Sequence, residues 1–486
     1  MPPVLPPGSQ LESREHERAA RIRFRRAVTL MVMTLLLPGS AQLVAGNRKV
    51  GRVALRVTIL TVGIGLFLLL LSLVWHDFAL RSATNPLLLG LLRLVMIGLA
   101  LGWAGLFVDA WRLGQPLSLI KNQRLAMVGI NGLLTFSVAG TLLFGAHLVG
   151  VHRAFIVANF GDGHATGPHD GRYNVLLLGG DSGAGRDGMR PDSITVASID
   201  EETGQTVLFG LPRNMLNFTF AEGSVMAEQF PDGYDCGTEC ELNSLSTWAN
   251  DNKSLFKDSE RPAGVQATID GVEGITGLKI NYYAQVNLDG FKKFVTAMGG
   301  LTLNVRDRIP IGRIGKIEGY VEPGIRKLNG YETLWYARSR AAADDYSRMA
   351  RQKCVLNAML QQLTPGMVVR KYQKLTEATA GLIETDLPAS ELARFADLAL
   401  EAKAKPVRTV SFVPPAVSTS NPDIDEIHDM VDKALSSAKE KAKKKAKPAA
   451  PKDGFTRDKV QTQGASKGSY SSGYSANEAT DLGSAC

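Results

Sequence analysis

The chain has 486 residues, of which 45% are hydrophobic, and a formal net charge of +8. The charge is concentrated at the two ends: ten basic and three acidic residues lie in 1–56, eleven basic and six acidic residues lie in 431–486, and the remainder carries −4. The length excludes a single small domain, and the acidic middle argues against nucleic acid as a partner, because binding DNA or RNA requires a basic surface.

The N-terminal third is apolar. Its uncharged or nearly uncharged segments predict three membrane-spanning helices, over 57–75, 85–109 and 125–151. An earlier apolar stretch is interrupted at Pro38 and Gly39, so we expect 27–37 to be a short re-entrant or interfacial helix, with a fourth span as the alternative. Basic residues are frequent before the first span and between the second and third, which predicts a cytoplasmic N-terminus and an extracytoplasmic chain from residue 152.

From Tyr173 the pattern changes to that of a layered α/β domain. Short apolar runs predict strands over 174–181, 193–199, 206–211, 282–286, 301–305 and 407–413. Longer amphipathic stretches predict helices over 264–276, 288–298, 330–335 and 345–362. The interval 173–415 is long enough to bury a full hydrophobic core.

These patterns divide the chain into five parts. They are a basic N-terminus (1–26), a membrane region (27–151), a linker (152–172), the α/β domain (173–415) and a charged, largely disordered C-terminal tail (416–486). An extracytoplasmic domain favours a disulfide. Cys236 with Cys240 is the preferred pair; the alternatives are a bond from either of them to Cys354, and unpaired buried thiols.

Arginines and aspartates gather in the loops of the α/β domain, where hydrophobic packing does not require them: Asp181, Arg190, Asp192, Arg213, Arg338 and Arg340. A guanidinium group grips phosphate oxygens with two parallel hydrogen bonds. Several arginines at the ends of strands would therefore converge on one anion. A pyrophosphate suits them, and Asp181 or Asp192 could hold a magnesium ion that bridges it.

The same segments resemble the LytR-CpsA-Psr family, in particular its actinobacterial branch. The motifs are Asn174–Asp181, Arg190–Ser193, Leu211–Arg213, Asn281–Phe291, Met298–Val305, Leu328–Glu332, Tyr336–Arg340 and Arg351–Gln352. The resemblance implies transmembrane helices followed by an extracytoplasmic α/β/α domain with a central mixed sheet. It also implies a multi-pass protein of the cell membrane, a phosphotransferase that uses Mg²⁺ to ligate a glycopolymer from a polyprenyl-pyrophosphate carrier onto peptidoglycan through a phosphodiester.

Residue by residue, the resemblance implies a catalytic set of Asp192, Arg213, Arg338 and Arg340. It implies pyrophosphate contacts from Arg190, Arg213, Arg338, Arg340, Arg348 and Gln352, and magnesium ligands at Asp181 and Asp192. The lipid tail would occupy an apolar cavity. The base for the acceptor hydroxyl is open between Asp192 and Asp344. Two other functions compete with transfer: a non-catalytic, lipid-pyrophosphate-binding regulatory wall protein, and a pyrophosphate hydrolase.

Overall fold

The computed structural model describes residues 7–46, 48–75, 78, 82–160, 164–181, 188–313, 315–340, 345–379, 382–443 and 482. The chain forms two compact units, residues 1–154 and 155–486. The first unit is helical, and its last helix continues into the second: α1 (Pro7–Leu36), α2 (Ser40–Ala45), α3 (Arg48–Val74), α5 (Pro86–Leu113), the 3₁₀ turn η1 (Pro116–Ser118) and α6 (Lys121–Asn159).

Within the described part of the first unit, three helical segments are long and apolar enough to cross a membrane: Arg48–Ser72, Pro86–Ser118 and Lys121–Asn159. They overlap all three predicted spans: 125–151 lies wholly inside the third segment, 85–109 begins one residue before the second, and 57–75 ends three residues after the first. The fourth apolar stretch belongs to α1, which begins at Pro7, so the expected start of a short helix at residue 27 is wrong. The reason is that Glu, Arg and Ala, all strong helix formers, occupy the turns before residue 27.

The helical structure is interrupted between α1 and α2, at the position of Pro38 and Gly39 where the sequence predicted an interruption. Gly39 has a φ of 93°, and a Cβ there would lie 2.6 Å from the carbonyl oxygen of Gly51, so only glycine fits this turn. Polar side chains then fix both helices to α5. Trp103 donates from Nε1 to the carbonyl oxygen of Thr34 at 3.0 Å, and Gln42 donates to that of Leu106 at 3.0 Å.

The second unit is built on a six-stranded mixed sheet in the order β10-β3-β2-β1-β4-β9. Its strands are β1 (Arg172–Asp181), β2 (Arg190–Asp200), β3 (Thr206–Leu211), β4 (Tyr282–Asn287), β9 (Ile383–Thr385) and β10 (Arg408–Ser411). β1 pairs antiparallel with β2 and parallel with β4, and β3 pairs antiparallel with β2 and parallel with β10. All the strands predicted for this sheet are present.

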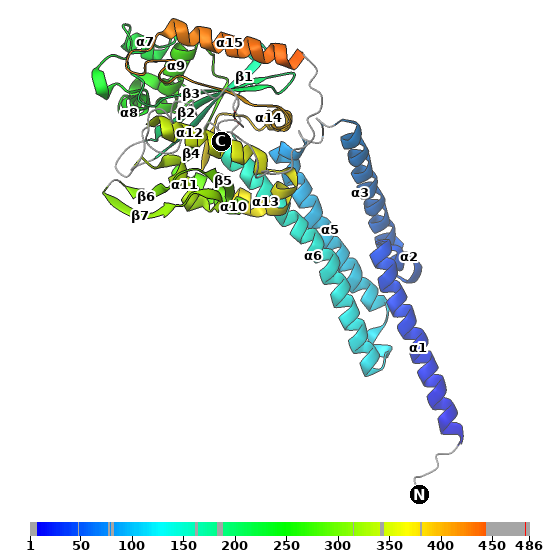
Figure 1. The fold of residues 1–486 in the computed structure, drawn as a ribbon. Helices are drawn as coiled ribbons and strands as arrows, with labels where there is room; N and C mark the ends of the chain where they lie inside the picture. Colours follow the sequence, from blue (N-terminus) through cyan, green and yellow to red (C-terminus); the bar gives the residue numbers. More distant parts are fainter. Residues whose placement is uncertain are drawn as a thin grey trace. The chain divides into compact units, whose positions relative to one another are not determined.

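Helices cover both faces of the sheet, as the alternation of side chains along a strand requires (Figure 1). Leu176 and Leu178 of β1 pack in one core with α9 (Ala263–Thr276) and α15 (Ile424–Lys443). Leu177, between them, faces the opposite side and packs with α12 (Asp345–Gln362), while α14 (Leu392–Lys403) covers the start of β1 on that side. The domain is therefore an α/β/α sandwich.

Helix α15 belongs to the domain, which therefore extends beyond its predicted end. Its residues Ile427, Val431, Ala434 and Ala438 are buried in the same core as α9. The predicted boundary at residue 415, with a largely disordered tail beyond it, is therefore too early, because the stretch 424–443 carries an apolar stripe at helical spacing. Residues 444–481 lie outside the described part of the chain.

The remaining elements complete the domain around a second core. Two small antiparallel sheets pair β5 (Leu301–Val305) with β8 (Gly324–Leu328) and β6 (Ile309–Arg313) with β7 (Lys316–Val321). The longer helices are α10 (Leu288–Met298), α11 (Gly330–Arg338) and α13 (Pro365–Thr379). The short helices α7 (Val225–Gln229) and α8 (Leu245–Asp251) and the 3₁₀ turns η2 (Gly237–Glu239), η3 (Leu242–Ser244) and η4 (Lys253–Phe256) lie between β3 and α9.

Candidate functional site

A β-bulge at the carboxyl end of β1 places the two predicted metal ligands. Gly179 pairs with Ser193, but the next residue, Gly180, pairs with Pro191, so Asp192 is an extra residue on β2 without a partner in the ladder. Bulges of this kind redirect a side chain. Asp181, which pairs with Arg190, ends β1 at the same edge. The bulge therefore brings both carboxylates to the end of one pair of strands.

An ion-pair network joins this edge to the start of α12. Arg213, two residues beyond β3, donates from Nη1 to Asp192 Oδ1 at 2.8 Å and from Nε to Asp345 Oδ2 at 2.9 Å. Arg348 donates from Nη2 to the same oxygen of Asp345 at 3.1 Å and to the carbonyl oxygen of Asp192 at 3.1 Å. Asp345 is thus shared by two arginines.

The network is electrostatically compensated inside the domain. Burial disfavours the charge of Asp345, but Arg348 and Arg213 outweigh it and lower the pKa of this carboxyl group. Burial also opposes the charge of Arg213, and here Asp345 and Asp192 raise the pKa. Arg348, whose side chain is only 2% exposed, has its pKa lowered to about 10 by burial. All three groups are therefore charged at neutral pH.

Two more arginines lie at the exposed side of the network. Arg338 ends α11, with Nη2 4.0 Å from Asp181 Oδ2 and its guanidinium carbon 5.2 Å from the centre of the Trp335 ring. Arg340 lies 3.7 Å from Asp345 Oδ1 through Nη1. These distances are longer than direct hydrogen bonds, so both guanidinium groups retain donors for a ligand.

The other predicted pyrophosphate contacts differ in their surroundings. Arg190 donates from Nη2 to Asn243 at 2.8 Å and to Glu241 at 3.1 Å, so this end of its side chain is directed at the segment around η3. Gln352 makes a long contact, 3.4 Å, with the carbonyl oxygen of Ala337. Arg348 lies behind the exposed arginines and holds Asp192 and Asp345 in place.

Asp345, the carboxylate that contacts Arg213, Arg348 and Arg340, was not among the residues predicted for the site. The neighbouring Asp344, which was predicted as a candidate base, lies outside the described residues. A signal was available: Asp345 stands three residues before Arg348, the spacing at which helical side chains pair, and it opens a helix, where a negative charge is stabilised by the helix dipole.

The chemistry of the two strand-end carboxylates suits Mg²⁺. The side chain of Asp181 is 44% exposed, and the hydrogen bond that Asp192 accepts from Arg213 uses its Oδ1. In the described ranges, no group of three or more His, Cys, Asp or Glu residues could hold a metal ion alone. Magnesium typically takes one or two carboxylates and completes its shell with water and substrate phosphates. Asp181 and Asp192 would hold it in that way.

A cavity of about 230 Å³ opens beside Asp192, between the sheet and α12. Its lining is mostly apolar, with Leu177, Leu208 and Leu356 among the wall residues. Asp192 and Gln352 also line it, so the cavity is continuous with the ion-pair network. An apolar cavity beside arginines can accept an amphiphilic anion, with its chain inside and its charge at the network.

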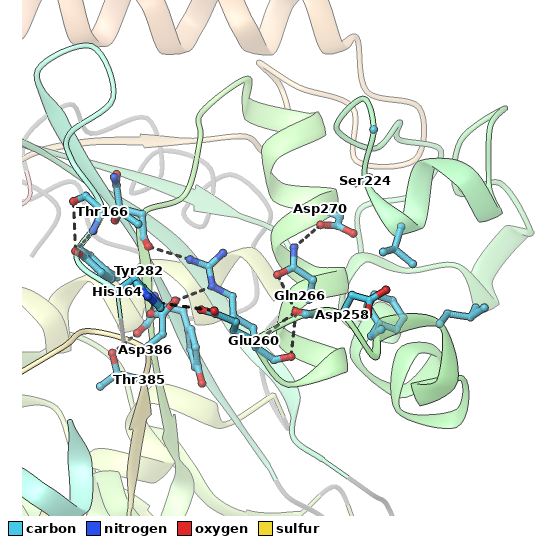
Figure 2. A pocket seen from close by; sticks show the side chains of 18 residues that line it. His164, Thr166, Ser224, Asp258, Glu260, Gln266, Asp270, Tyr282, Thr385 and Asp386 are labelled. Atoms are coloured by element: carbon cyan, nitrogen blue, oxygen red, sulfur yellow. Dashed lines mark hydrogen bonds and ion pairs between the residues drawn. The ribbon is translucent and has the colours of Figure 1, made fainter. Parts of the chain in front are cut away.

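A second and larger cavity, of about 640 Å³, lies elsewhere in the domain (Figure 2). It is lined by residues at the start of β4 and on α9, and by none of the predicted site residues. Its polar groups bind one another: Arg261 donates to Asp386 at 2.6 Å, and Gln266 donates to Asp270 at 2.7 Å. Four carboxylates line it against one arginine, so it is poorly suited to a pyrophosphate.

The preferred disulfide is present. Cys236 and Cys240 flank η2 and are bonded, with a Cα–Cα distance of 5.2 Å. The alternatives, in which either pairs with Cys354 or both are unpaired, are therefore wrong. Cys354 on α12 is also disulfide-bonded.

The chain thus combines helices long and apolar enough to cross a membrane with an α/β/α domain, in which arginines and carboxylates lie together at the end of the central strands. Residues 158–444 match the LytR_cpsA_psr family. The match covers more than half of the chain, and the chain belongs to this family.

Two curated relatives are each 25% identical to this chain over the residues that align. Biofilm regulatory protein A of Streptococcus mutans is 25% identical over 275 residues, which are 55% of this chain and 62% of that protein. The polyisoprenyl-teichoic acid–peptidoglycan teichoic acid transferase TagV of Bacillus subtilis is 25% identical over 227 residues, 45% of this chain and 51% of that protein. The chain therefore covers between half and two thirds of the length of these relatives.

Two solved structures each cover more than half of this chain. The crystal structure of B. subtilis TagV covers 56% of this chain and 98% of that one, with 23% identity and a TM-score of 0.40. A LytR-Csp2A-Psr enzyme from Actinomyces oris covers 57% of this chain and 93% of that one, with 16% identity and a TM-score of 0.39.

Proposed function

We propose that the chain is a phosphotransferase that ligates a glycopolymer from a polyprenyl-pyrophosphate carrier onto peptidoglycan, with Mg²⁺, at the outer face of the cell membrane of an actinobacterium. The observation that carries the proposal is the arginine–carboxylate network beside an apolar cavity. TagV carries the name of such a transferase. The anchor supports the proposal, since a polyprenyl carrier is itself confined to a membrane.

The chain's own residues would act mainly by positioning and by neutralising charge, which dominate phosphoryl transfer. Arg338 and Arg340, with donors to spare, would grip the pyrophosphate oxygens. Arg213 would keep its contacts with Asp192 and Asp345 and add positive charge where the leaving phosphate forms. Arg348 would hold this framework from behind.

Asp181 and Asp192 would hold the magnesium ion, which supplies positive charge to the phosphate oxygens when it is bound. The proton of the acceptor hydroxyl would pass to Asp192, if magnesium leaves one of its oxygens accessible, or to Asp344, which lies outside the described residues. The lipid chain would enter the 230 Å³ cavity. The acceptor oxygen then forms a bond to the sugar-linked phosphorus, the bond from that phosphorus to the bridging oxygen breaks, and polyprenyl phosphate leaves with the bridging oxygen.

The test incubates the full chain in detergent with a prenyl-diphosphate-linked disaccharide, with or without glycan fragments of peptidoglycan, at several magnesium concentrations. Release of prenyl phosphate together with a phosphodiester-linked glycan, detected by mass spectrometry, is the expected result. Release without a linked glycan would identify a hydrolase. Binding without release at any magnesium concentration would favour the regulatory wall protein.

Variants test the site. Arg338→Ala should lower the rate by about 10²–10³, the usual cost of removing one preorganised donor. Arg338→Lys should be nearly as damaging, because lysine keeps the charge but lacks the planar fork. The matched control is Arg326→Lys on the exposed strand β8, which should leave the rate unchanged. Normal rates in both Arg338 variants would place the pyrophosphate elsewhere.

A further inference from the structure

Helix α12 carries a disulfide-bonded cysteine, Cys354, for which the sequence leaves one partner. The chain has four cysteines, and Cys236 and Cys240 are bonded to each other. Cys486 is the fourth, and it lies outside the described residues. Leu482, four positions before it, is described, and so shows where this part of the sequence meets the domain.

Leu482 is docked between the sheet and α12. It is only 1% exposed and belongs to one apolar cluster with Leu208 of β3 and Val407, which precedes β10. Leu356 of α12 packs against the same cluster. The backbone amide of Leu482 also donates to the carbonyl oxygen of Val407 at 2.9 Å. Apolar contacts and a hydrogen bond therefore fix this residue beside the helix that carries Cys354.

Cys486 can reach Cys354 from this position. Cys354 and Leu356 are two residues apart on α12, so they point to nearly opposite sides of the helix, and Cys354 packs in the second core. Four residues of chain from Leu482 span up to about 14 Å, and a disulfide joins Cα atoms that are about 4–7 Å apart. A helix with its side chains is about 10–12 Å across, so the chain is long enough to pass around α12.

The docked leucine supports the far wall of the 230 Å³ cavity, the part away from the arginines. Leu208 and Leu356 line that cavity and pack with Leu482. Leu208 lies three residues before Leu211, which ends β3 on the side of the ion-pair network, and Leu356 lies about two turns of α12 beyond Arg348. Leu482 therefore packs behind the cavity wall at the end opposite to the network.

We propose that Cys354 and Cys486 form a second disulfide, and that this bond keeps Leu482 against the far wall of the cavity. The bond forms when the two thiols lose two protons and two electrons to a protein disulfide of the thiol oxidoreductase class, which is itself reduced to a dithiol. The covalent tether raises the effective concentration of Leu482 at its docking place, so the residue stays bound although its own contacts are few. Reduction would release Leu482 and leave the far wall without its support. The inference goes beyond the proposed function and does not depend on it.

The experiment uses the full chain in detergent and has two readouts by mass spectrometry. After proteolysis without reduction, the peptides that contain Cys354 and Cys486 should be linked, and reduction should separate them. In hydrogen–deuterium exchange, the amide of Leu482 should exchange more than about tenfold faster in Cys486→Ser than in the wild type, because local opening is no longer limited by the tether. The matched control is the double variant Cys236→Ser/Cys240→Ser, which removes the other disulfide and should keep both the linked peptides and the slow exchange.

A further variant separates the bond from the docking. Leu482→Ala should keep the linked peptides but exchange faster at position 482, because the apolar contacts are lost while the tether remains. Unlinked peptides in the wild type would overturn the disulfide. Linked peptides with equal exchange in the wild type and Cys486→Ser would overturn its role in holding Leu482. Neither readout involves a substrate, so both results stand apart from the prenyl phosphate assay that tests the proposed function.

Discussion

At the scale of single residues, the site depends on Asp345 more than on any residue that the sequence analysis chose. Its Oδ2 accepts hydrogen bonds from Arg213 at 2.9 Å and from Arg348 at 3.1 Å, and Nη1 of Arg340 lies 3.7 Å from its Oδ1. Arg348 is almost fully buried, and removing the partner of a buried charge is far more damaging than removing an exposed pair. Asp345 therefore links the geometry of the proposed site to the stability of the domain.

Replacing this carboxylate tests that link. We expect Asp345→Asn to lower the free energy of unfolding by about 3–5 kcal/mol, because Arg348 then remains charged and buried without its main counter-ion. Urea denaturation followed by near-UV circular dichroism measures the change. Asp289→Asn is the control, since its pair with Lys292 is exposed and should contribute less than about 1 kcal/mol. Equal effects of the two substitutions would contradict a central role for Asp345.

Lys353 predicts a pH dependence of stability. Its pKa is about 7 in the folded chain, whereas a lysine in the unfolded chain keeps its proton to about pH 10.4. Between these values the unfolded state binds more protons, so the free energy of unfolding should rise with pH, by up to about 1.4 kcal/mol per pH unit. Denaturation at pH 7, 8 and 9 measures the slope, and Lys353→Met should reduce it. Identical slopes in the two proteins would show that Lys353 is not the group responsible.

The residues of the site were only partly accessible from the sequence. Asp181, Asp192, Arg213, Arg338 and Arg340 could be selected because polar residues at strand ends have no packing reason to be there, and the structure brings them together. Burial of Arg348 could not be foreseen, since a helix pattern does not reveal which polar face meets the sheet. The place of Lys353 on the cavity wall could not be foreseen for the same reason.

At the scale of elements, the bulge between β1 and β2 is the feature that aims Asp192. Gly180 permits it, because a Cβ at this position would lie 2.2 Å from the carbonyl oxygen of Arg190, inside the contact limit of any real side chain. At Gly179 the nearest atom to such a Cβ is the Cβ of Ser193, at 3.5 Å, an ordinary contact. Two adjacent glycines of one strand thus have different roles.

The two glycines therefore give a matched pair of variants. Gly180→Ala should displace the β2 backbone, destabilise the domain by about 1–3 kcal/mol and lower activity more than stability alone explains, because Asp192 moves with the backbone. Gly179→Ala should be tolerated. Thermal denaturation and the prenyl phosphate release assay measure both effects. A tolerated Gly180→Ala with full activity would show that the bulge does not position Asp192.

Elements were predictable where burial imposes a strong pattern. The continuous apolar runs of β1 and β3 follow from their place inside a sheet covered on both faces. β7 was missed because five of its six residues are exposed or half-exposed, so no alternation marks it. α13 and α14 were missed because they bury few large apolar side chains, such as Leu375 and Leu398. In both cases tertiary contacts, which a local pattern does not contain, decide the structure.

At the scale of the whole molecule, the two units differ in where their apolar side chains lie, and so in the solvent that suits them. The described part of the first unit exposes long apolar helices, which water would not tolerate, whereas the second buries its apolar residues in continuous cores. The sequence separates the units clearly, since spans are recognisable by length and hydropathy alone. The end of the second unit was harder to place, because α15 carries many charges on its exposed side and resembles a solvated tail.

The last prediction concerns the side of the membrane on which the domain lies. With three spans and a cytoplasmic N-terminus, parity places everything after α6 outside and the turn between α5 and α6 inside, in agreement with the basic residues Arg112, Lys121 and Arg124 around that turn. Single cysteines at His164, an exposed residue, and at Arg112 can report this topology, because none of the described native cysteines is a free thiol. A membrane-impermeant maleimide applied to intact cells should label position 164 and not position 112, and both should react after permeabilisation. Labelling of position 112 alone in intact cells would reverse the orientation, and with it the extracytoplasmic location that ligation to peptidoglycan requires.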